Sequence, residues 1–347
     1  MNSDEHGSAR ESRLVAIRKE AEEKGLVAAV GIRPAGSPMP VASPETGYYG
    51  QPLLKEPQWT PLVPLYFFVG GASGSLGVNG SLADLLGAEK ELARKARWMA
   101  FGGSGISAIL LIADLGRPSR FLNMLRVFKP QSPMSMGSWI LAGFSTSAAI
   151  SSLADVLAAA YEDRAAIAFL RGIGRIGSVA FGMPFHNYPG VLLAASVIPV
   201  WNNRIHSLPR EFGMSGLQSA ISLLELTGQT DSAALNAIGL VSAGFESWEG
   251  IDLLSTHERA LLPAKRGGSG VLVQIAGLLS GPIPIALRIA SLFVKNKKQM
   301  RQLAALSGIA GSLLMRYGWV RAGTISARDW KIPMLIDERE KARSLSK

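Results

Sequence analysis

The chain has 347 residues, 48% of them hydrophobic, and carries a formal net charge of +10. It has no cysteine, which excludes disulfides, cysteine-held iron–sulfur clusters and thiol catalysis. On a soluble protein the positive charge would suggest a nucleic-acid partner. Here the cations lie in short loops between apolar runs, so we expect a protein embedded in membrane lipid that binds no nucleic acid.

Polar segments flank the apolar part of the chain. Residues 1–58 are charged at first and then rich in Pro, Gly and Ser, which predicts a partly irregular arm without the apolar core of a signal peptide. Residues 323–347 form a polar C-terminal tail. The predicted organisation is therefore an arm at 1–58, a transmembrane bundle at 59–322 and a tail at 323–347.

Eight apolar segments fill the region between the arm and the tail. Their lengths approach the ~20 residues that cross a bilayer, and backbone groups in lipid must pair within the segment, which favours helices. The predicted fold class is all-α, a polytopic membrane helix bundle of about eight transmembrane helices. Small residues four apart, such as Gly70 and Gly74, predict close helix packing. The segments are 62–86, 96–115, 136–160, 172–201, 211–228, 234–254, 269–293 and 301–321.

The second segment ends at Asp114 and leads into the loop "DLGRPSRFLNMLRVFKPQSPMS". A carboxylate near membrane depth is costly, so Asp114 is either a functional group or the ion-pair partner of Arg117 or Arg120. The loop combines cations for electrostatic steering, aromatic anchors and prolines that limit the entropy lost on docking. The residues expected to dock a redox partner are Arg117, Arg120, Phe121, Phe128 and Lys129.

The fourth segment contains His186 and Tyr188 between Pro184 and Pro189. Each proline removes a backbone donor and disturbs the helix, which suggests a locally opened helix with a polar pocket. The alternative is a pair of hydrogen-bonded core residues at a kink. The run "GIGRIG" at 172–177 matches G-x-G-x-x-G, but no strand precedes it, so we expect helix packing rather than a dinucleotide site.

The sixth segment carries Glu246 and Glu249, whose spacing of three places both on one helix face. Two carboxylates that close cannot both ionise cheaply in a low dielectric, which favours a proton held by one of them and a proton relay. An interfacial pair that faces lipid head groups or Arg259 is the alternative. Three single charges are expected to be ion-pair partners or snorkelling side chains: Glu225, Arg288 and Arg316.

Alternating passage through the membrane brings several of these groups to one side. The start of the first helix with Tyr66, the end of the second with Asp114 and the start of the third with Ser135 and Trp139 lie on the same side as the loop. The later halves of the fourth and sixth helices point toward that side as well. We therefore expect polar groups from five helices to converge beneath the loop.

Three stretches of the sequence resemble the polysulfide-reductase membrane-subunit family, also called NrfD/PsrC. They are "PLYFFVGGASGS", then "LIADLGRPSRFLNMLRVFKPQSPMSMGSWIL", and "YPGVLLAASVIPVW" followed by "LPREF". The resemblance runs from about residue 59 to about residue 228 and is strongest through the second and third helices. Toward the C-terminus the number and order of helices carry it.

The resemblance implies an eight-helix subunit without a redox centre of its own that binds a quinone, ubiquinone or menaquinone, as substrate. It also implies a four-cluster ferredoxin-like iron–sulfur partner, often joined to a molybdopterin catalytic subunit of the formate, polysulfide or nitrite oxidoreductase type. In the family the quinone head lies near the partner-facing ends of the first, second and fourth helices. By position this points to Tyr66, Asp114 and Tyr188, with His186 nearby. Family members often carry an acidic, amide or histidine side chain early in the first helix, whereas this chain offers a tyrosine and two serines.

These features together predict a quinone-reactive anchor subunit, not catalytic alone, in a bacterial or archaeal cell membrane. We expect Asp114 and Tyr188 to donate protons to the quinone, His186 or Glu246 to resupply them, and Glu246 and Glu249 to belong to the quinone site. No haem, iron–sulfur cluster or metal site is expected, because cysteine is absent and only His186 falls at membrane depth. The alternatives are a secondary transporter or proton pathway and a purely structural anchor.

Overall fold

The computed structural model describes residues 54–329 apart from 88, 116 and 162–163, and in addition residues 15–16, 19–20, 23 and 332. The side chain of Arg120 is outside this description. The chain forms two units, Met1–Gln51 and Pro52–Lys347, and the helices discussed below all belong to the second. Most of the predicted arm at 1–58 and of the predicted tail at 323–347 lies outside the described residues.

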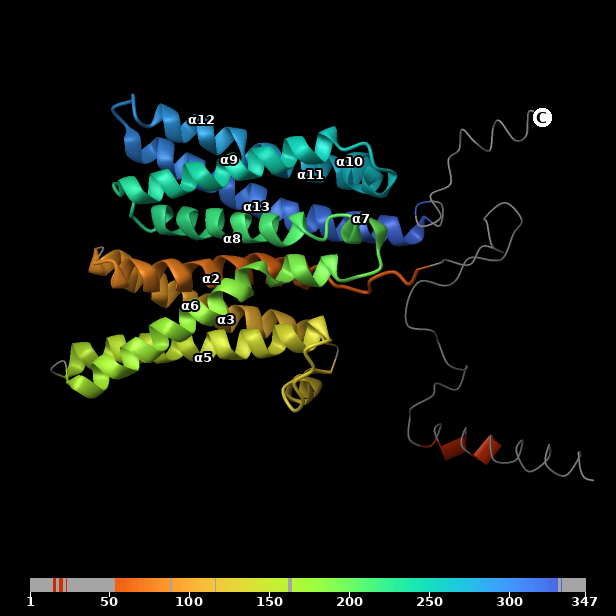
Figure 1. Ribbon diagram of the computed structural model, residues 1–347, viewed down its shortest axis with the longest axis horizontal. Coiled ribbons are helices and arrows are strands. Elements are labelled where there is room, and N and C mark those ends of the chain that lie inside the picture. Colours follow the sequence, from red (N-terminus) through yellow and green to blue (C-terminus); the bar gives the residue numbers. More distant parts are fainter. Residues whose placement is uncertain are drawn as a thin grey trace, which may run out of the picture. The chain divides into compact units, whose positions relative to one another are not determined.

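Long helices dominate the second unit (Figure 1). Short helices lie in the connections, namely α4 (Phe121–Met124), α7 (Pro199–Asn202), α10 (Leu262–Lys265) and the 3-10 turns Pro118–Arg120 and Arg259–Leu261. No strand occurs among the residues that the structure describes. The long helices are α2 (Leu62–Leu85), α3 (Lys90–Asp114), α5 (Pro133–Ala160), α6 (Ala165–Ala194), α8 (Ser207–Leu226), α9 (Ala233–Ser255), α11 (Gly267–Ser280), α12 (Pro282–Ala290) and α13 (Lys297–Arg328).

The all-α fold class is confirmed. Six of the predicted segments correspond to one helix each, whereas the fourth, 172–201, runs past the end of α6 into α7, and the seventh covers the pair α11 and α12. Within the described part of the chain, six segments are long and apolar enough to cross a membrane: α2, α3, α5, α6, the α11–α12 pair and α13. Helices α8 and α9 are not among the six, and both carry buried charges, such as Glu225 in α8 and Glu246 in α9. Helix α13 ends at Arg328, past residue 323 where the tail was predicted to begin.

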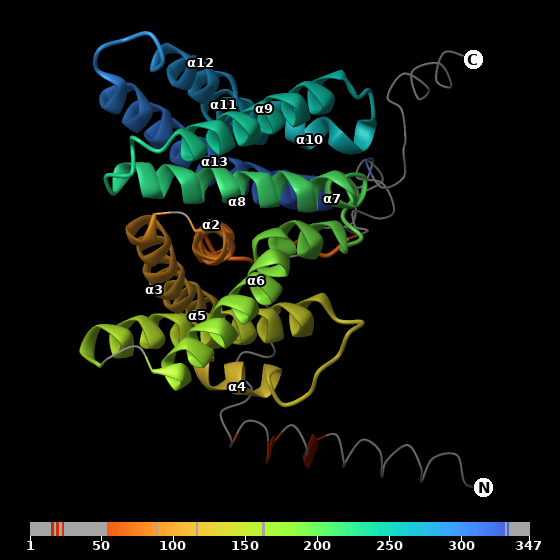
Figure 2. The same ribbon diagram turned by 60° about the vertical axis from the view of Figure 1, so that its left-hand side comes forward.

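Helix α2 lies at the centre of the N-terminal half, in contact with α3, α6 and α8 (Figure 2). The predicted close packing is found here. A Cβ atom at Gly70 would lie 3.1 Å from the ring of Phe185, and one at Gly74 would lie 2.9 Å from the backbone nitrogen of His186. Helix α5 packs on α6 and α3. The four helices α2, α3, α5 and α6 thus form one half of the bundle.

Helix α8 joins this half to the second half, which contains α9, α11, α12 and α13. It contacts α2 and α6 as well as α9 and α13. The seventh segment is broken at Gly281, whose backbone angles of φ −106° and ψ −95° are not helical. Pro282 and Pro284 follow at once, and prolines cannot donate the hydrogen bonds that would continue α11 into α12.

The alternating helix directions give the bundle two ends. We call the loop end the one that holds the end of α3 and the start of α5, with the connecting loop between them, and the far end the opposite one. The loop end lies to the right in Figure 1 and the far end to the left. Trp201 of α7 lies at the loop end, where its indole nitrogen donates to the carbonyl of Trp319 at 2.8 Å and its ring stacks on Trp59.

Candidate functional site

Tyr188 lies on α6 near the loop end and faces α5. Its hydroxyl donates to the carbonyl oxygen of Pro133, the first residue of α5, at 2.6 Å. Its ring packs against Gly137, where any side chain would overlap the ring. The phenol is therefore buried and oriented, and its oxygen keeps the capacity to accept a further hydrogen bond.

His186 points to another side of the same helix, because residues two apart on an α-helix are rotated by about 200°. Its Cδ2 atom lies close to Gly213 of α8 and its Cβ atom close to Gly74 of α2. Nδ1 lies 3.1 Å from the carbonyl oxygen of Gly182. Since a carbonyl only accepts, Nδ1 carries the hydrogen and Nε2 of the neutral ring is an acceptor. His186 and Tyr188 therefore do not line one common pocket.

The expected opening of the fourth helix is not present. Helix α6 is continuous from Ala165 to Ala194, through both Pro184 and Pro189. Each proline removes a single donor, and the helical hydrogen bonds on either side are enough to hold the backbone. The alternative expectation, hydrogen-bonded residues packed in the core beside prolines, describes His186 and Tyr188 better.

Asp114 and Tyr66 lie at the loop end of the neighbouring helices. Asp114 is the last residue of α3, and its Oδ1 accepts hydrogen bonds from the hydroxyl of Thr60 at 2.5 Å and from the Thr60 backbone nitrogen at 3.3 Å. The described partner of Asp114 is thus Thr60, just before α2; of the two expected partners, Arg117 makes no printed contact with it and the side chain of Arg120 is not described. Tyr66 on α2 is buried beside Phe67, and α2 packs against α6, which carries Tyr188.

The loop between α3 and α5 presents the predicted docking residues to different degrees. Arg117 and Lys129 are exposed, Phe121 is half-buried, and the side chain of Arg120 is not described. Phe128 is 53% exposed and packs edge-on against Trp139 of α5, with ring centroids 6.0 Å apart. The loop is tied to α5 through the Ser135 hydroxyl, which accepts from the Lys129 backbone nitrogen at 3.1 Å and lies 3.2 Å from the Val127 carbonyl oxygen, to which it donates.

An apolar groove of about 650 Å³ opens between α5 and α6 just below this loop. Phe128 and Trp139 line it on the loop side, and Phe181 of α6 lines its inner wall. Tyr188 lies about two helical turns from Phe181, toward the loop end. Trp139 and Phe181 are partly exposed apolar side chains on membrane helices, so the groove faces lipid.

Glu246 and Glu249 lie on α9 in the other half of the bundle and have separate partners. One oxygen of Glu249 accepts from Arg204 at 2.7 Å, and Arg210 lies 3.8 Å from the other. Glu246 accepts from the hydroxyl of Ser280 at 3.1 Å, while its second oxygen has no hydrogen-bond partner among the described residues. Glu249 therefore has arginine partners, whereas the printed side-chain partner of Glu246 is a serine.

The candidate residues thus form two groups. Tyr66, Asp114 and Tyr188 lie on α2, α3 and α6 beneath the loop, as the helix directions predicted. Glu249 is also at the loop end but belongs to the second half, and Glu246 lines a separate groove of about 240 Å³ between α9 and α11. The geometry therefore does not bring these five residues, three in the first half and two in the second, into one site.

A sequence profile of the polysulfide reductase family matches residues 45–328, which is most of the chain. The chain belongs to the NrfD-type polysulfide reductase family. No match is found among curated proteins. As an NrfD-type protein the chain is an integral membrane subunit of an oxidoreductase family whose members associate with iron–sulfur and molybdopterin subunits.

The match to NrfD-type proteins also covers the C-terminal half, where sequence reasoning missed a buried polar side of α8. Its members recur every three or four residues: Glu211, Ser215, Gln218, Ser222 and Glu225. This spacing is that of one helix face and was readable from the sequence. Trp319 donates to Glu211 at 2.8 Å, and the fully buried Arg316 donates to the hydroxyls of Ser215 and Ser312.

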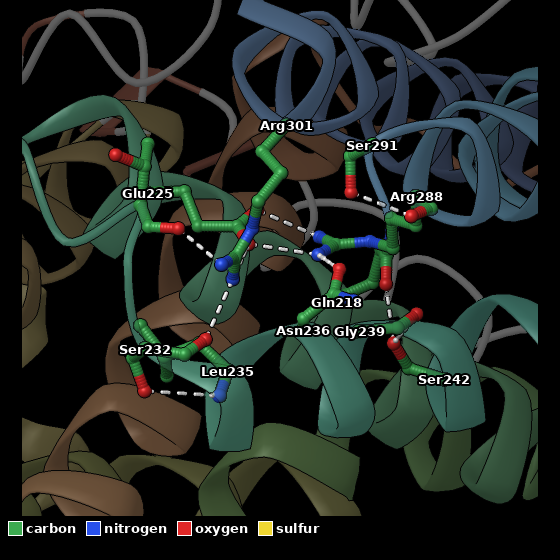
Figure 3. Close-up of polar contacts among 11 residues, drawn as sticks. Gln218, Glu225, Ser232, Leu235, Asn236, Gly239, Ser242, Arg288, Ser291 and Arg301 are labelled. Atoms are coloured by element: carbon green, nitrogen blue, oxygen red, sulfur yellow. Dashed lines mark hydrogen bonds and ion pairs between the residues drawn. The ribbon is translucent and has the colours of Figure 1, made fainter. Parts of the chain in front are cut away.

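Glu225 ends this polar side of the NrfD-type bundle at the far end (Figure 3). Its two oxygens accept from both terminal nitrogens of Arg288 at 2.8 Å, and one of them also accepts from Arg301 at 2.8 Å. Other donors of Arg301 reach the carbonyl oxygens of Thr230 and Ser232. Glu225 and Arg288 are 0% exposed, which confirms their expected role as an ion pair.

Proposed function

We propose that this NrfD-type subunit passes electrons between an iron–sulfur partner and the membrane quinone pool, and that the quinone head is held at the loop end beside Tyr188. The observation that carries this proposal is the apolar groove between α5 and α6, which opens to lipid below the exposed cations of the loop. A groove of this kind suits a substrate with an apolar tail and a small polar head.

The chemistry requires a proton at each quinone carbonyl as two electrons arrive from the partner. Tyr188 is the group best placed to contact the head, because it is buried, oriented and packed on Gly137, the neighbour of Met136 in the groove lining. Its hydroxyl hydrogen now bonds to the Pro133 carbonyl, so donation to a quinone requires the hydroxyl to exchange that acceptor for the ligand. Tyr66 on the neighbouring helix α2 is the second candidate donor.

The other candidates act less directly in this proposal. His186 faces α2 and α8, so it relays protons from the opposite side of α6 rather than touching the head. Asp114 is bound to Thr60 and fixes the start of α2, and with it the position of Tyr66. Arg117 and Lys129 are exposed on the loop and supply the charge for docking an acidic face of the partner.

The test is Tyr188→Phe, which removes one hydroxyl and little volume. We expect electron transfer from the reduced partner to a soluble quinone analogue to fall by about a hundredfold or more, the usual scale for losing a positioned proton donor. Electron transfer from the partner to an artificial dye should be unchanged. The matched control is Tyr161→Phe, since Tyr161 is exposed at the far end and should retain full quinone activity.

Two outcomes separate the proposal from its alternatives. If Tyr188→Phe assembles with the partner and keeps full quinone activity, Tyr188 is not the donor and the structural-anchor interpretation is favoured. If dye reduction falls together with quinone reduction, the substitution has disturbed docking instead of chemistry.

A further inference from the structure

A charged pocket of about 510 Å³ lies at the far end of the N-terminal half, away from the proposed quinone site. It is enclosed by the end of α2, the start of α3, the end of α5 and the start of α6. Arg97 forms its floor. Two of its nitrogens contact Asp155 at 2.7–3.0 Å, and a third contacts Asp84 at 2.8 Å.

Among the residues that the structure describes, the floor of this pocket holds three arginines and two aspartates. Arg175 also contacts Asp84, and Arg171 lies 3.8 Å from Asp155. With Arg97, three arginines therefore surround two aspartates. The Nε atom of Arg175 is buried and has no hydrogen-bond partner in the part of the chain that the structure describes.

The rim of the pocket adds to this excess. Lys90 and Arg94 line the pocket and are exposed. Glu91 also lines it, but its carboxylate contacts Lys95 at 2.7 Å on the same helix. The pocket is thus an open, positively charged recess at a membrane interface, with several guanidinium groups that suit a phosphate.

An apolar groove of about 500 Å³ continues from the pocket along the same two helices, α3 and α5. Trp98 lies one turn beyond Arg94 on α3, and Val156 follows Asp155 on α5. Trp98, Phe101, Leu153 and Val156 line the groove and are between 39% and 54% exposed. An aromatic side chain such as Trp98 is typical of the boundary between head groups and acyl chains.

We propose that this recess and groove form a binding site for an anionic phospholipid. The phosphate lies between the rim cations and the arginines of the floor, and an acyl chain lies in the groove between α3 and α5. The charged recess alone would suit a free anion and the groove alone would suit any apolar tail. A charged head joined to an acyl chain is the ligand that uses both.

The experiment uses the purified full-length chain in detergent, stripped of lipid and titrated with phosphatidylglycerol or with phosphatidylcholine of the same acyl chains. Bound lipid is counted by native mass spectrometry. We expect Lys90→Gln combined with Arg94→Gln to weaken phosphatidylglycerol binding by about thirtyfold, from roughly fivefold per interfacial cation. The matched control is Lys295→Gln with Lys298→Gln, two exposed cations at the same end, one in the connection after α12 and one in the first turn of α13; this variant should bind normally.

A second arm separates the head from the tail. Trp98→Ala should weaken phosphatidylglycerol binding while leaving the charged recess intact. Displacement of the lipid by millimolar inorganic phosphate would show a free-anion site, and displacement by a quinone analogue would show a second quinone groove; either result overturns the proposal. Equal binding of the two lipids, or normal binding after loss of the rim cations, overturns it as well.

Discussion

Two clusters of arginines and carboxylates at the far end of the bundle differ in their access to solvent. In the open cluster, Arg97, Arg171 and Arg175 surround Asp84 and Asp155 around a pocket. In the sealed cluster, Arg288 and Arg301 surround Glu225 in the core of the second half. Counted over the described residues alone, each cluster has one more arginine than carboxylate, yet the open cluster is accessible and the sealed cluster is buried.

The difference lies in what balances the surplus charge. In the sealed cluster, backbone carbonyls of the α8–α9 connection accept from Arg301, so fixed dipoles of the protein take up its remaining donors. In the open cluster, the surplus faces a pocket where water or a ligand anion can reach it. The sealed cluster is therefore expected to serve structure, and the open one to serve binding.

The largest expected effect is on the free energy of unfolding, when one carboxylate is removed from each cluster. Glu225→Gln leaves two buried arginines without a carboxylate and should lower the free energy of unfolding by about 3–5 kcal/mol. Asp84→Asn should cost only about 1 kcal/mol, because water in the pocket can solvate the arginines. The measurement is thermal unfolding of both variants in the same detergent. Equal losses would remove the distinction between sealed and open clusters.

A smaller effect should come from the packing of the sealed cluster. Gly239 of α9 lies against the guanidinium group of Arg288, and a methyl group there would overlap it. Gly239→Ala should therefore destabilise the protein by about 1–3 kcal/mol through overpacking. Gly244 is on the same helix, and a methyl group there would meet no atom within 4 Å, so Gly244→Ala should be neutral or stabilising by less than about 1 kcal/mol. Thermal unfolding compares them, and a stable Gly239→Ala variant would mean that Arg288 is free to move.

The smallest effect concerns ligand affinity in the open cluster. Asp84→Asn raises the positive charge of the pocket by one and should strengthen phosphatidylglycerol binding by about fivefold. Asp252→Asn, which removes a carboxylate paired with Arg204 at the loop end, should leave lipid binding unchanged. Native mass spectrometry of both variants decides this, and an equal rise in both would indicate a general charge effect and no particular site.

The sequence was sufficient to predict the helices, because length, apolar composition and small-residue spacing are local properties. It also predicted that Tyr66, Asp114 and Tyr188 share the loop end, since alternating helix directions follow from chain order. Their assignment to a quinone site stays a prediction. Glu225 and Arg288 were each expected to be an ion-pair partner or a snorkelling side chain. The sequence did not show that these two residues, 63 positions apart, pair with each other.

The orientation of each side chain and its contact partners could not be predicted. Asp114 binds Thr60, which is 54 residues earlier in the chain. Glu249 binds Arg204, which is 45 residues earlier in the chain. These partners are set by the rotation of each helix about its axis, and that rotation results from packing among all the helices.

The break at Gly281 has a mechanical consequence. Helix α12 is nine residues long, starts directly after the break at Gly281 and carries Arg288 in its last turn. The guanidinium of Arg288 is paired with Glu225 on α8, so any rotation of α12 relative to α11 at Gly281 would have to break that ion pair. The buried ion pair thereby ties the helix that follows the break to α8, across 63 residues of the chain.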